Sequence, residues 1–160
     1  MKVKGIISED FVNYKKPSIT IMFPYCTFKC GTDYCQNSSL ADEKNIEISI
    51  EEIVKRYIQN PITESMVMQG LEPFDSWNDL YLLLTELRKY SSDDFVIYTG
   101  YNKDEIQDKI NQLSIFKNVI VKFGRYIPNQ EKHYDNVLEV YLASDNQYAE
   151  KISWFNMCSG

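Results

Sequence analysis

The stretch Ser18-Ile-Thr-Ile-Met-Phe23 leads through Pro24 and Tyr25 into three closely spaced cysteines, at positions 26, 30 and 35. Its β-branched and apolar residues predict a strand that carries the thiols at its carboxyl end. In parallel α/β architectures, ligands collect where the strands end. The stretch therefore predicts both a core strand and the place of a site.

Strand and helix patterns alternate downstream of this stretch. We expect strands over 65–69, 95–98 and 119–122, and helices from the Ser49 capping box to before Pro61, over 77–90 and over 103–113. The alternation predicts βαβ units, a mainly parallel sheet and a single α/β domain over residues 1–160. A late strand is possible over 138–142, whereas 125–136 show no periodicity.

The composition disfavours several kinds of site. The 17 Lys+Arg and 23 Asp+Glu give a net charge of −6, which disfavours a partner bound through nucleic-acid phosphates. The chain has one His, His133, so it cannot supply two imidazoles to a site. We find neither a secretory signal nor an apolar run that could span a membrane, and we expect a cytoplasmic protein without a membrane partner. Clustered thiols in a reducing compartment indicate metal or redox chemistry more often than disulfides.

Four predicted strands end in unusual residues. The cysteine segment follows the first, Gly70-Leu71-Glu72-Pro73 follows the second, Thr99-Gly100 follows the third, and Lys122 to Arg125 close the fourth. Because the carboxyl ends of parallel strands meet at one edge of a sheet, we expect one assembled site.

The spacing Cys26-x3-Cys30-x4-Cys35 places three soft ligands on one short loop. A cubane iron–sulfur cluster held by three thiolates leaves one iron open to a substrate. A structural zinc site usually takes four protein ligands, and only Cys158 or His133, both remote in sequence, could supply the fourth. The spacing favours the cluster, and zinc or ordinary cysteines remain the alternatives.

Taken together, these motifs resemble those of radical S-adenosylmethionine enzymes. The cysteine segment, with Tyr34 before the last Cys, is similar to the family's C-x3-C-x-Φ-C loop, in which Φ is aromatic. Met68-Gln-Gly-Leu-Glu-Pro73 resembles its G-G-E-P turn, whose backbone carbonyls receive the amino group of S-adenosylmethionine. Tyr98-Thr-Gly-Tyr101 and Ser144-Asp-Asn-Gln147 resemble the W-T-G-Y and S-S-N-Q segments of the small activating proteins of anaerobic ribonucleotide reductase. The resemblance extends over about residues 10–147.

Three positions depart from the family's pattern. The second cysteine gap has four residues where the family has two, so the path around Asp33 differs. Leu71 replaces the second Gly of G-G-E-P, where a positive φ or a close approach would need Gly. Leu142-Ala143 stands where the family often has Arg-Gly, and a role for that Arg does not transfer to this chain.

The resemblance implies a partial, open parallel α/β barrel and an oxidoreductase activity. A [4Fe–4S] cluster on Cys26, Cys30 and Cys35 would cleave S-adenosylmethionine reductively, and the 5′-deoxyadenosyl radical would take a hydrogen from a glycine of a partner enzyme. The implied partners are the large catalytic subunit of anaerobic ribonucleotide reductase and a small electron-donor protein such as a flavodoxin or ferredoxin.

The resemblance and the position of residues at strand ends give a candidate set of cofactor-binding residues. Tyr34 is expected near the adenine, backbone groups at 70–72 near the amino group, and Lys122 or Arg125 near the carboxylate. The full set is Tyr34, Gly70, Leu71, Glu72, Thr99, Gly100, Lys122, Arg125, Ser144 and Asn146. The alternatives are a simple turn role for Glu72, ordinary surface charges for Lys122 and Arg125, and plain loop roles for Ser144 and Asn146.

Two other functions remain open from the sequence. One is activation of a different glycyl-radical enzyme, or another small radical S-adenosylmethionine reaction. The other is a non-enzymatic zinc or iron–sulfur binding module. Cys158, two residues from the end, is most simply a free thiol.

Overall fold

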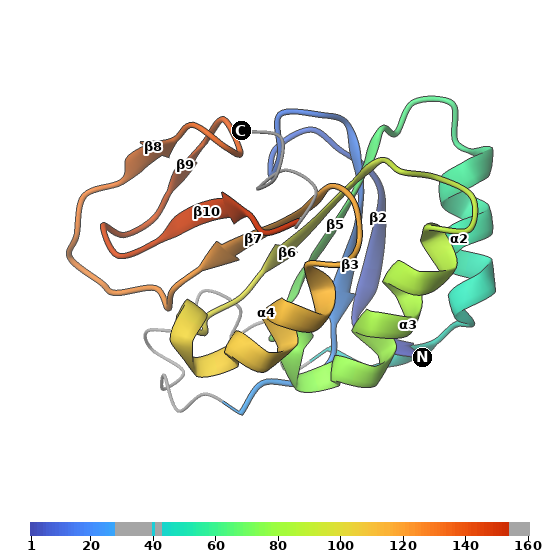
Figure 1. The fold of residues 1–160 in the computed structure, drawn as a ribbon, viewed down its shortest axis with the longest axis horizontal. Coiled ribbons are helices and arrows are strands. Elements are labelled where there is room, and N and C mark those ends of the chain that lie inside the picture. Colours follow the sequence, from blue (N-terminus) through green and yellow to red (C-terminus); the bar gives the residue numbers. More distant parts are fainter. Residues whose placement is uncertain (28–39, 41–42, 154–160) are drawn as a thin grey trace.

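The computed structural model describes residues 1–27, 40 and 43–153. Its centre is a six-stranded sheet with the order β10-β7-β6-β5-β3-β2 (Figure 1). The four inner strands are parallel and the two edge strands are antiparallel to their neighbours. The inner strands are β3 (Ser18–Phe23), β5 (Ser65–Gly70), β6 (Asp94–Tyr98) and β7 (Val119–Phe123), and the edges are β2 (Gly5–Asp10) and β10 (Tyr148–Lys151).

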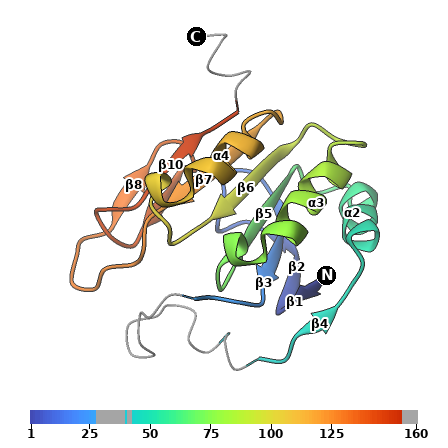
Figure 2. The ribbon, with the colours of Figure 1, turned by 60° about the horizontal axis from the view of Figure 1, so that its bottom comes forward.

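In the part of the chain that the structure describes, three helices connect the parallel strands and cover one face of the sheet (Figure 2). They are α2 (Ile50–Gln59), α3 (Trp77–Leu87) and α4 (Gln107–Leu113), the last two preceded by the 3₁₀ turns η1 (Pro73–Ser76) and η2 (Lys103–Ile106). The side chain of Ser49 accepts a hydrogen bond from the Glu52 N–H at 3.1 Å, as the capping motif predicts. None of the helices in the described ranges has the length and apolar character needed to cross a lipid bilayer.

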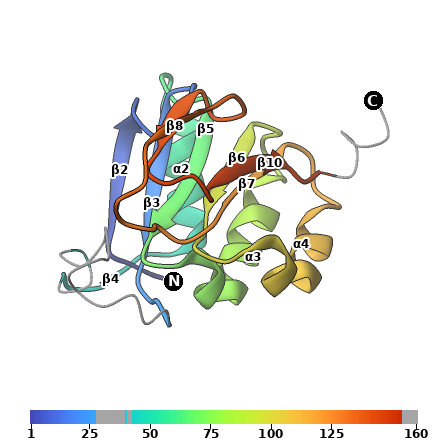
Figure 3. The ribbon, with the colours of Figure 1, turned by 90° about the vertical axis from the view of Figure 1, so that its left-hand side faces the viewer.

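A small hairpin packs on the opposite face of the sheet, and Figure 3 shows it apart from α3 and α4. The hairpin consists of β8 (His133–Asp135) and β9 (Val140–Leu142). A separate short pair joins β1 (Lys2–Val3) to β4 (Ile46–Glu47). In the hairpin, Leu138 and Leu142 pack in one buried cluster with Val67, Val96 and Ile120 of the sheet. The helices instead pack on the alternate strand residues, such as Met66, Met68, Phe95 and Ile97.

The four parallel strands expected from the sequence are confirmed, with boundaries within one residue. The expected helix over 77–90 ends at Leu87, and the one over 103–113 begins as 3₁₀ turn η2. The late strand begins at Val140 because 136–139 form the hairpin turn. The edge strands β2 and β10 lie outside the expected elements. The partial barrel stays a prediction: the described sheet has β10 and β2 as its two edges.

Gly70 ends β5 in a conformation that suits only glycine. Its φ is +94°, and a Cβ at this position would lie 2.3 Å from the backbone nitrogen of Phe23 and 2.7 Å from the carbonyl carbon of Met22. The non-glycine residues with positive φ in the described ranges are Asn118, Asn129 and Glu139. Leu71 is not among them, so the residue of this turn that needs a positive φ is Gly70.

We expect Gly70→Ala to lower the free energy of unfolding by about 2–4 kcal/mol, because the substitution adds left-handed strain and a backbone clash. Gly5→Ala is the matched control, since its Cβ would meet only the methyl carbon of Met22 at 4.0 Å. Urea denaturation of both variants measures the difference. Equal stabilities of the two variants would contradict this reading of Gly70.

Candidate functional site

A cavity of about 360 Å³ lies at the carboxyl ends of β5, β6 and β7. Its floor includes Gln69, Tyr98 and Lys122, one from each strand. By strand alternation these side chains share a face with Val67, Val96 and Ile120, so the cavity is on the side opposite the helices. The apolar residues of this face support the hairpin, and the polar residues beyond them form the cavity. Its volume is in the range of small-molecule sites.

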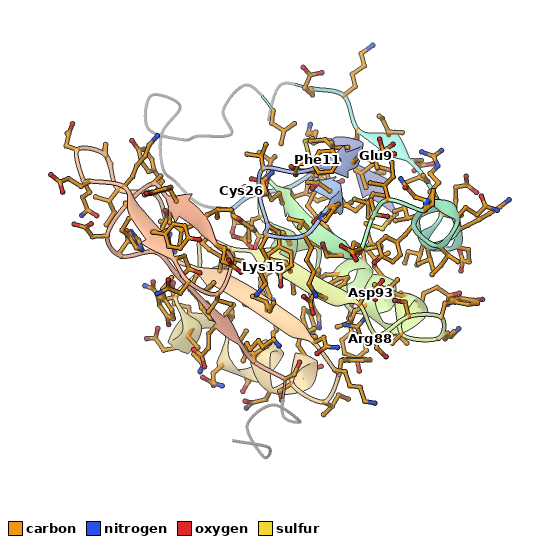
Figure 4. The ribbon with its side chains drawn as sticks, turned by 90° about the horizontal axis from the view of Figure 1, so that it is seen from above. Glu9, Phe11, Lys15, Cys26, Arg88 and Asp93 are labelled. Atoms are coloured by element: carbon orange, nitrogen blue, oxygen red, sulfur yellow. The ribbon has the colours of Figure 1, made fainter. Side chains whose placement is uncertain are left out.

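The walls of the cavity come from two segments distant in sequence. One is Val140 to Ala143, which comprises β9 and the residue after it, and the other is the pair Val12 and Asn13. The Tyr98 hydroxyl donates a hydrogen bond to the Asn13 carbonyl at 2.5 Å, which ties this loop to the sheet. Cys26, labelled in Figure 4, is exposed and also lines the cavity.

The Glu72 carboxylate joins the ends of two neighbouring strands. Its side chain is completely buried, and its Oε1 accepts hydrogen bonds from the Gly100 N–H at 2.8 Å and the Thr99 hydroxyl at 2.9 Å. Its Oε2 accepts from the Phe74 N–H at 3.0 Å. Burial raises the pKa of Glu72 to about 7, although the Gly100 and Phe74 N–H groups oppose the shift. Glu72 is thus more than a turn residue: it holds the β5 and β6 ends together.

Lys122 is a buried cation on the cavity floor. It is 6 % exposed, its Nζ donates to the Gly124 carbonyl at 3.0 Å, and the ammonium lies 5.6 Å from the centroid of the Tyr98 ring. Burial lowers the pKa of Lys122 to about 8, and the charge of Glu72 partly opposes this shift. The alternative that Lys122 is a surface charge is therefore wrong.

Arg125 also lines the cavity, but its environment is more open. Its side chain is 40 % exposed and forms an ion pair with Glu105 at 3.3 Å. Exposed ion pairs of this kind contribute little to stability. Of the two predicted cations, Lys122 is the one that the fold encloses.

The segment Ser144 to Gln147 supports the exit loop of β7. The Asn146 Nδ2 donates to the Arg125 carbonyl at 2.7 Å, and the Gln147 Nε2 donates to the Gly124 carbonyl at 3.2 Å. The Ser144 hydroxyl donates to the Asn146 Oδ1 at 2.6 Å. Gln147 is one of the residues that line the cavity, whereas Ser144 and Asn146 are not part of the described lining. Direct cofactor contact by Ser144 or Asn146 stays a prediction.

The structure brings most of the predicted residues to one cavity: Cys26, Gly70, Leu71, Glu72, Thr99, Gly100, Lys122 and Arg125. Cys30, Tyr34, Cys35 and Cys158 lie outside the described residues. Sequence reasoning did not assign a site role to Gln147, Tyr98, Asn13 or the β9 residues. The motifs around 98–101 and 144–147 contain two of these, but nothing local in the sequence indicates Asn13 or β9.

One described residue of the cavity lining could ligate a soft metal centre, and it is a cysteine. Cys26 supplies this thiol, while the oxygens of Glu72, the acid in the lining, are already engaged by N–H and O–H donors. Within residues 1–27, 40 and 43–153, no group of three or more His, Cys, Asp and Glu side chains could hold a metal ion. His133 lies on β8 and is not part of the described lining. This part of the chain thus offers no competing site of imidazoles and carboxylates.

Comparison with known proteins identifies one family. A family model described as "4Fe-4S single cluster domain" matches residues 17–148, which is most of the chain. Searches of curated proteins and of solved structures gave no match.

We expect Glu72→Gln to lower the free energy of unfolding by about 1–3 kcal/mol at pH 8, because the new amide NH₂ must face either the Gly100 or the Phe74 N–H. In the folded protein the pKa of Glu72 is raised to about 7. The stability that Glu72 contributes is therefore fully present below the pKa that Glu72 has in the unfolded chain, and it is lost as the pH rises through 7. The difference between wild type and E72Q should therefore be larger at pH 5 than at pH 8.

Chemical denaturation of the apo protein at the two pH values measures this difference. The exposed Glu131 offers a control, and Glu131→Gln should change stability little at either pH. An E72Q protein that is as stable as E131Q would contradict the structural role of the carboxylate.

Proposed function

The chain belongs to the family of 4Fe-4S single cluster domains, and on that premise we propose that it is a radical S-adenosylmethionine enzyme that activates anaerobic ribonucleotide reductase. The observation that carries the proposal is the shared cavity. Three different strand ends contribute to the lining of this cavity: they supply Cys26, the turn Gly70 to Glu72, and the buried Lys122.

The turn after β5 is arranged to present a carbonyl oxygen to a ligand. The Leu71 N–H donates to the Phe23 carbonyl and the Glu72 N–H to the Tyr25 carbonyl, while the Glu72 carbonyl accepts from Asp75. Within the described residues, the Leu71 carbonyl makes no hydrogen bond. An ammonium group is a suitable donor to such an oxygen, which supports recognition of the amino group of S-adenosylmethionine.

Lys122 supplies the charge that a carboxylate requires. An ammonium enclosed by the protein interacts more strongly with an anion than an exposed one, because less solvent screens the pair. The single hydrogen bond that Lys122 donates to Gly124 leaves capacity for a further acceptor, since an ammonium has three donors. We assign Lys122, before Arg125, to the methionine carboxylate.

The proposed cofactors supply the chemistry that the side chains lack. Held by the thiolates of Cys26, Cys30 and Cys35, a [4Fe–4S] cluster would supply the electron that cleaves S-adenosylmethionine into methionine and a 5′-deoxyadenosyl radical, which then takes a hydrogen from a glycine of the partner enzyme. A small electron-transfer protein such as a flavodoxin or ferredoxin would re-reduce the cluster. The chain's own residues bind and orient the cofactor.

We expect anaerobically reconstituted protein to contain four irons and four sulfides and to form 5′-deoxyadenosine when it is reduced with S-adenosylmethionine. Cys→Ala at position 26, 30 or 35 should each abolish this product, because each substitution removes a cluster ligand. Cys158→Ala is the matched control and should retain activity. With the large reductase subunit present, electron paramagnetic resonance should show a glycyl-radical doublet.

The outcomes separate the alternatives. Zinc without iron, or a cluster that never forms 5′-deoxyadenosine, would leave only a passive binding module. Product without a doublet on the reductase, but with one on another glycyl-radical enzyme, would show that the partner is different. An active Cys35→Ala variant would refute the ligand set.

We expect Lys122→Gln to weaken S-adenosylmethionine binding by roughly 10- to 100-fold at pH 7, the effect of losing a hydrogen bond to a charged group. Because the pKa of Lys122 is lowered to about 8, the wild-type ammonium loses its proton as pH rises above that value. The advantage of wild type over K122Q should then shrink by pH 9.5. Comparing the two proteins at each pH removes the effect of the cofactor's own titration.

Equilibrium dialysis against the labelled cofactor measures the affinities. Arg125→Gln is the matched control, and its effect should be smaller because Arg125 is exposed and paired with Glu105. A larger loss in R125Q than in K122Q would reverse the assignment of the carboxylate.

A further inference from the structure

Hydrogen bonds hold the chain on both sides of Cys26. On the preceding side, the carbonyls of Phe23 and Tyr25 accept from the Leu71 and Glu72 N–H groups at 3.1 and 2.8 Å. On the following side, Thr27 donates to Asp75 Oδ2 twice, from its N–H at 2.7 Å and from its hydroxyl at 3.0 Å. One short segment, 71–75, therefore forms hydrogen bonds with the residues on both sides of Cys26.

Asp75 is itself held by the end of the next strand. Its Oδ1 accepts a hydrogen bond from the Tyr101 hydroxyl at 2.6 Å, and that hydroxyl is also 3.4 Å from the Thr27 hydroxyl. Burial and the neighbouring carboxylate of Asp75 raise the pKa of Tyr101, so the phenol keeps its proton and remains a donor. The three side chains form one connected group beside Cys26.

Tyr101 is in turn anchored to two strand ends. Its N–H donates to the Thr99 hydroxyl at 3.0 Å, and its carbonyl accepts from the Gly124 N–H at 3.1 Å. The Thr99 hydroxyl belongs to the buried Glu72 group described above. The position of Thr27 is thus linked through Asp75 and Tyr101 to the ends of β6 and β7.

We propose that Asp75 and Tyr101 are positioning residues that fix the backbone beside Cys26 and thereby determine the position and orientation of the Cys26 thiolate as a ligand of the iron–sulfur cluster. The proposal rests on the assignment of Cys26 as a cluster ligand in the proposed function. It also gives a role to Tyr101, the last residue of the Y-T-G-Y segment. Residues around a ligand orient it, and cluster potentials respond to hydrogen bonds and to solvent exposure near the sulfurs.

The first test uses the apo protein and reads the Thr27 amide directly. Asp75→Ala should accelerate hydrogen exchange at the Thr27 N–H by roughly three- to tenfold, because the hydrogen bond that is lost is exposed to solvent, and Tyr101→Phe should accelerate it less. Asp75→Asn should restore part of the protection, since its amide oxygen still accepts. The exposed Asp104→Ala is the control and should match wild type.

The second test uses the reconstituted full-length protein and two properties of the cluster. The midpoint potential and the electron paramagnetic resonance spectrum of the reduced cluster should both change in D75A, change less in Y101F and D75N, and stay as in wild type in D104A. Circular dichroism identifies a D75A protein that fails to fold, in which case Y101F decides. Unchanged potentials and spectra in a folded D75A, or in Y101F when D75A does not fold, would overturn the positioning role.

Cys26→Ala separates this proposal from the one on which it rests. Loss of the cluster in C26A, together with the altered spectrum of D75A, supports both. Loss of the cluster in C26A with wild-type behaviour in D75A and Y101F overturns only the positioning role. A full cluster with a wild-type spectrum in C26A overturns the ligand assignment itself.

Discussion

The buried Glu72 carboxylate is the constraint on which the site depends. A carboxylate removed from water is costly unless hydrogen-bond donors meet it, and here the donors are Thr99, Gly100 and Phe74. Thr99 and Gly100 follow β6, and Phe74 lies in η1, whereas Glu72 itself follows β5. The requirement therefore determines how the β5 and β6 ends approach each other, and it also sets the position of the turn that carries Asp75.

The division of the sheet into two faces explains why the cavity lies where it does. Helices occupy one face, so the hairpin β8–β9 is left to cover the other. The hairpin packs over Val67, Val96 and Ile120, and its strand β9 also lines the cavity whose floor includes Gln69, Tyr98 and Lys122. The result is a partly open space at the strand ends, lined by both polar and apolar residues. Its lining includes the buried amine of Lys122 and the thiol of Cys26, and the chain belongs to a family of 4Fe-4S single cluster domains.

The proposed reaction accounts for the scarcity of acid–base side chains in the described cavity lining and for the binding groups that are present there. His133, the one histidine, is on the covering hairpin and not in the described lining, and the Glu72 oxygens are engaged in holding the fold. A reaction whose reactive species comes from cofactors needs binding and orientation from the protein, with little acid–base catalysis. The residues that line the cavity are of that kind: a glycine turn, backbone carbonyls and a buried amine.

Sequence alone determined the parallel strands and the meeting of their ends, because compact β-branched runs and capping signals are local. It did not indicate β2 and β10, whose stretches Gly5–Asp10 and Tyr148–Lys151 are partly exposed and mix polar with apolar residues. Only the tertiary structure decided that Gly70, rather than position 71, needs a positive φ, that Lys122 is buried, and that Glu72 and Asp75 join separate strand ends. The reason is physical: burial and hydrogen bonding depend on segments such as 23–27, 70–75 and 99–101, which are distant in the chain and meet only once the sheet has formed.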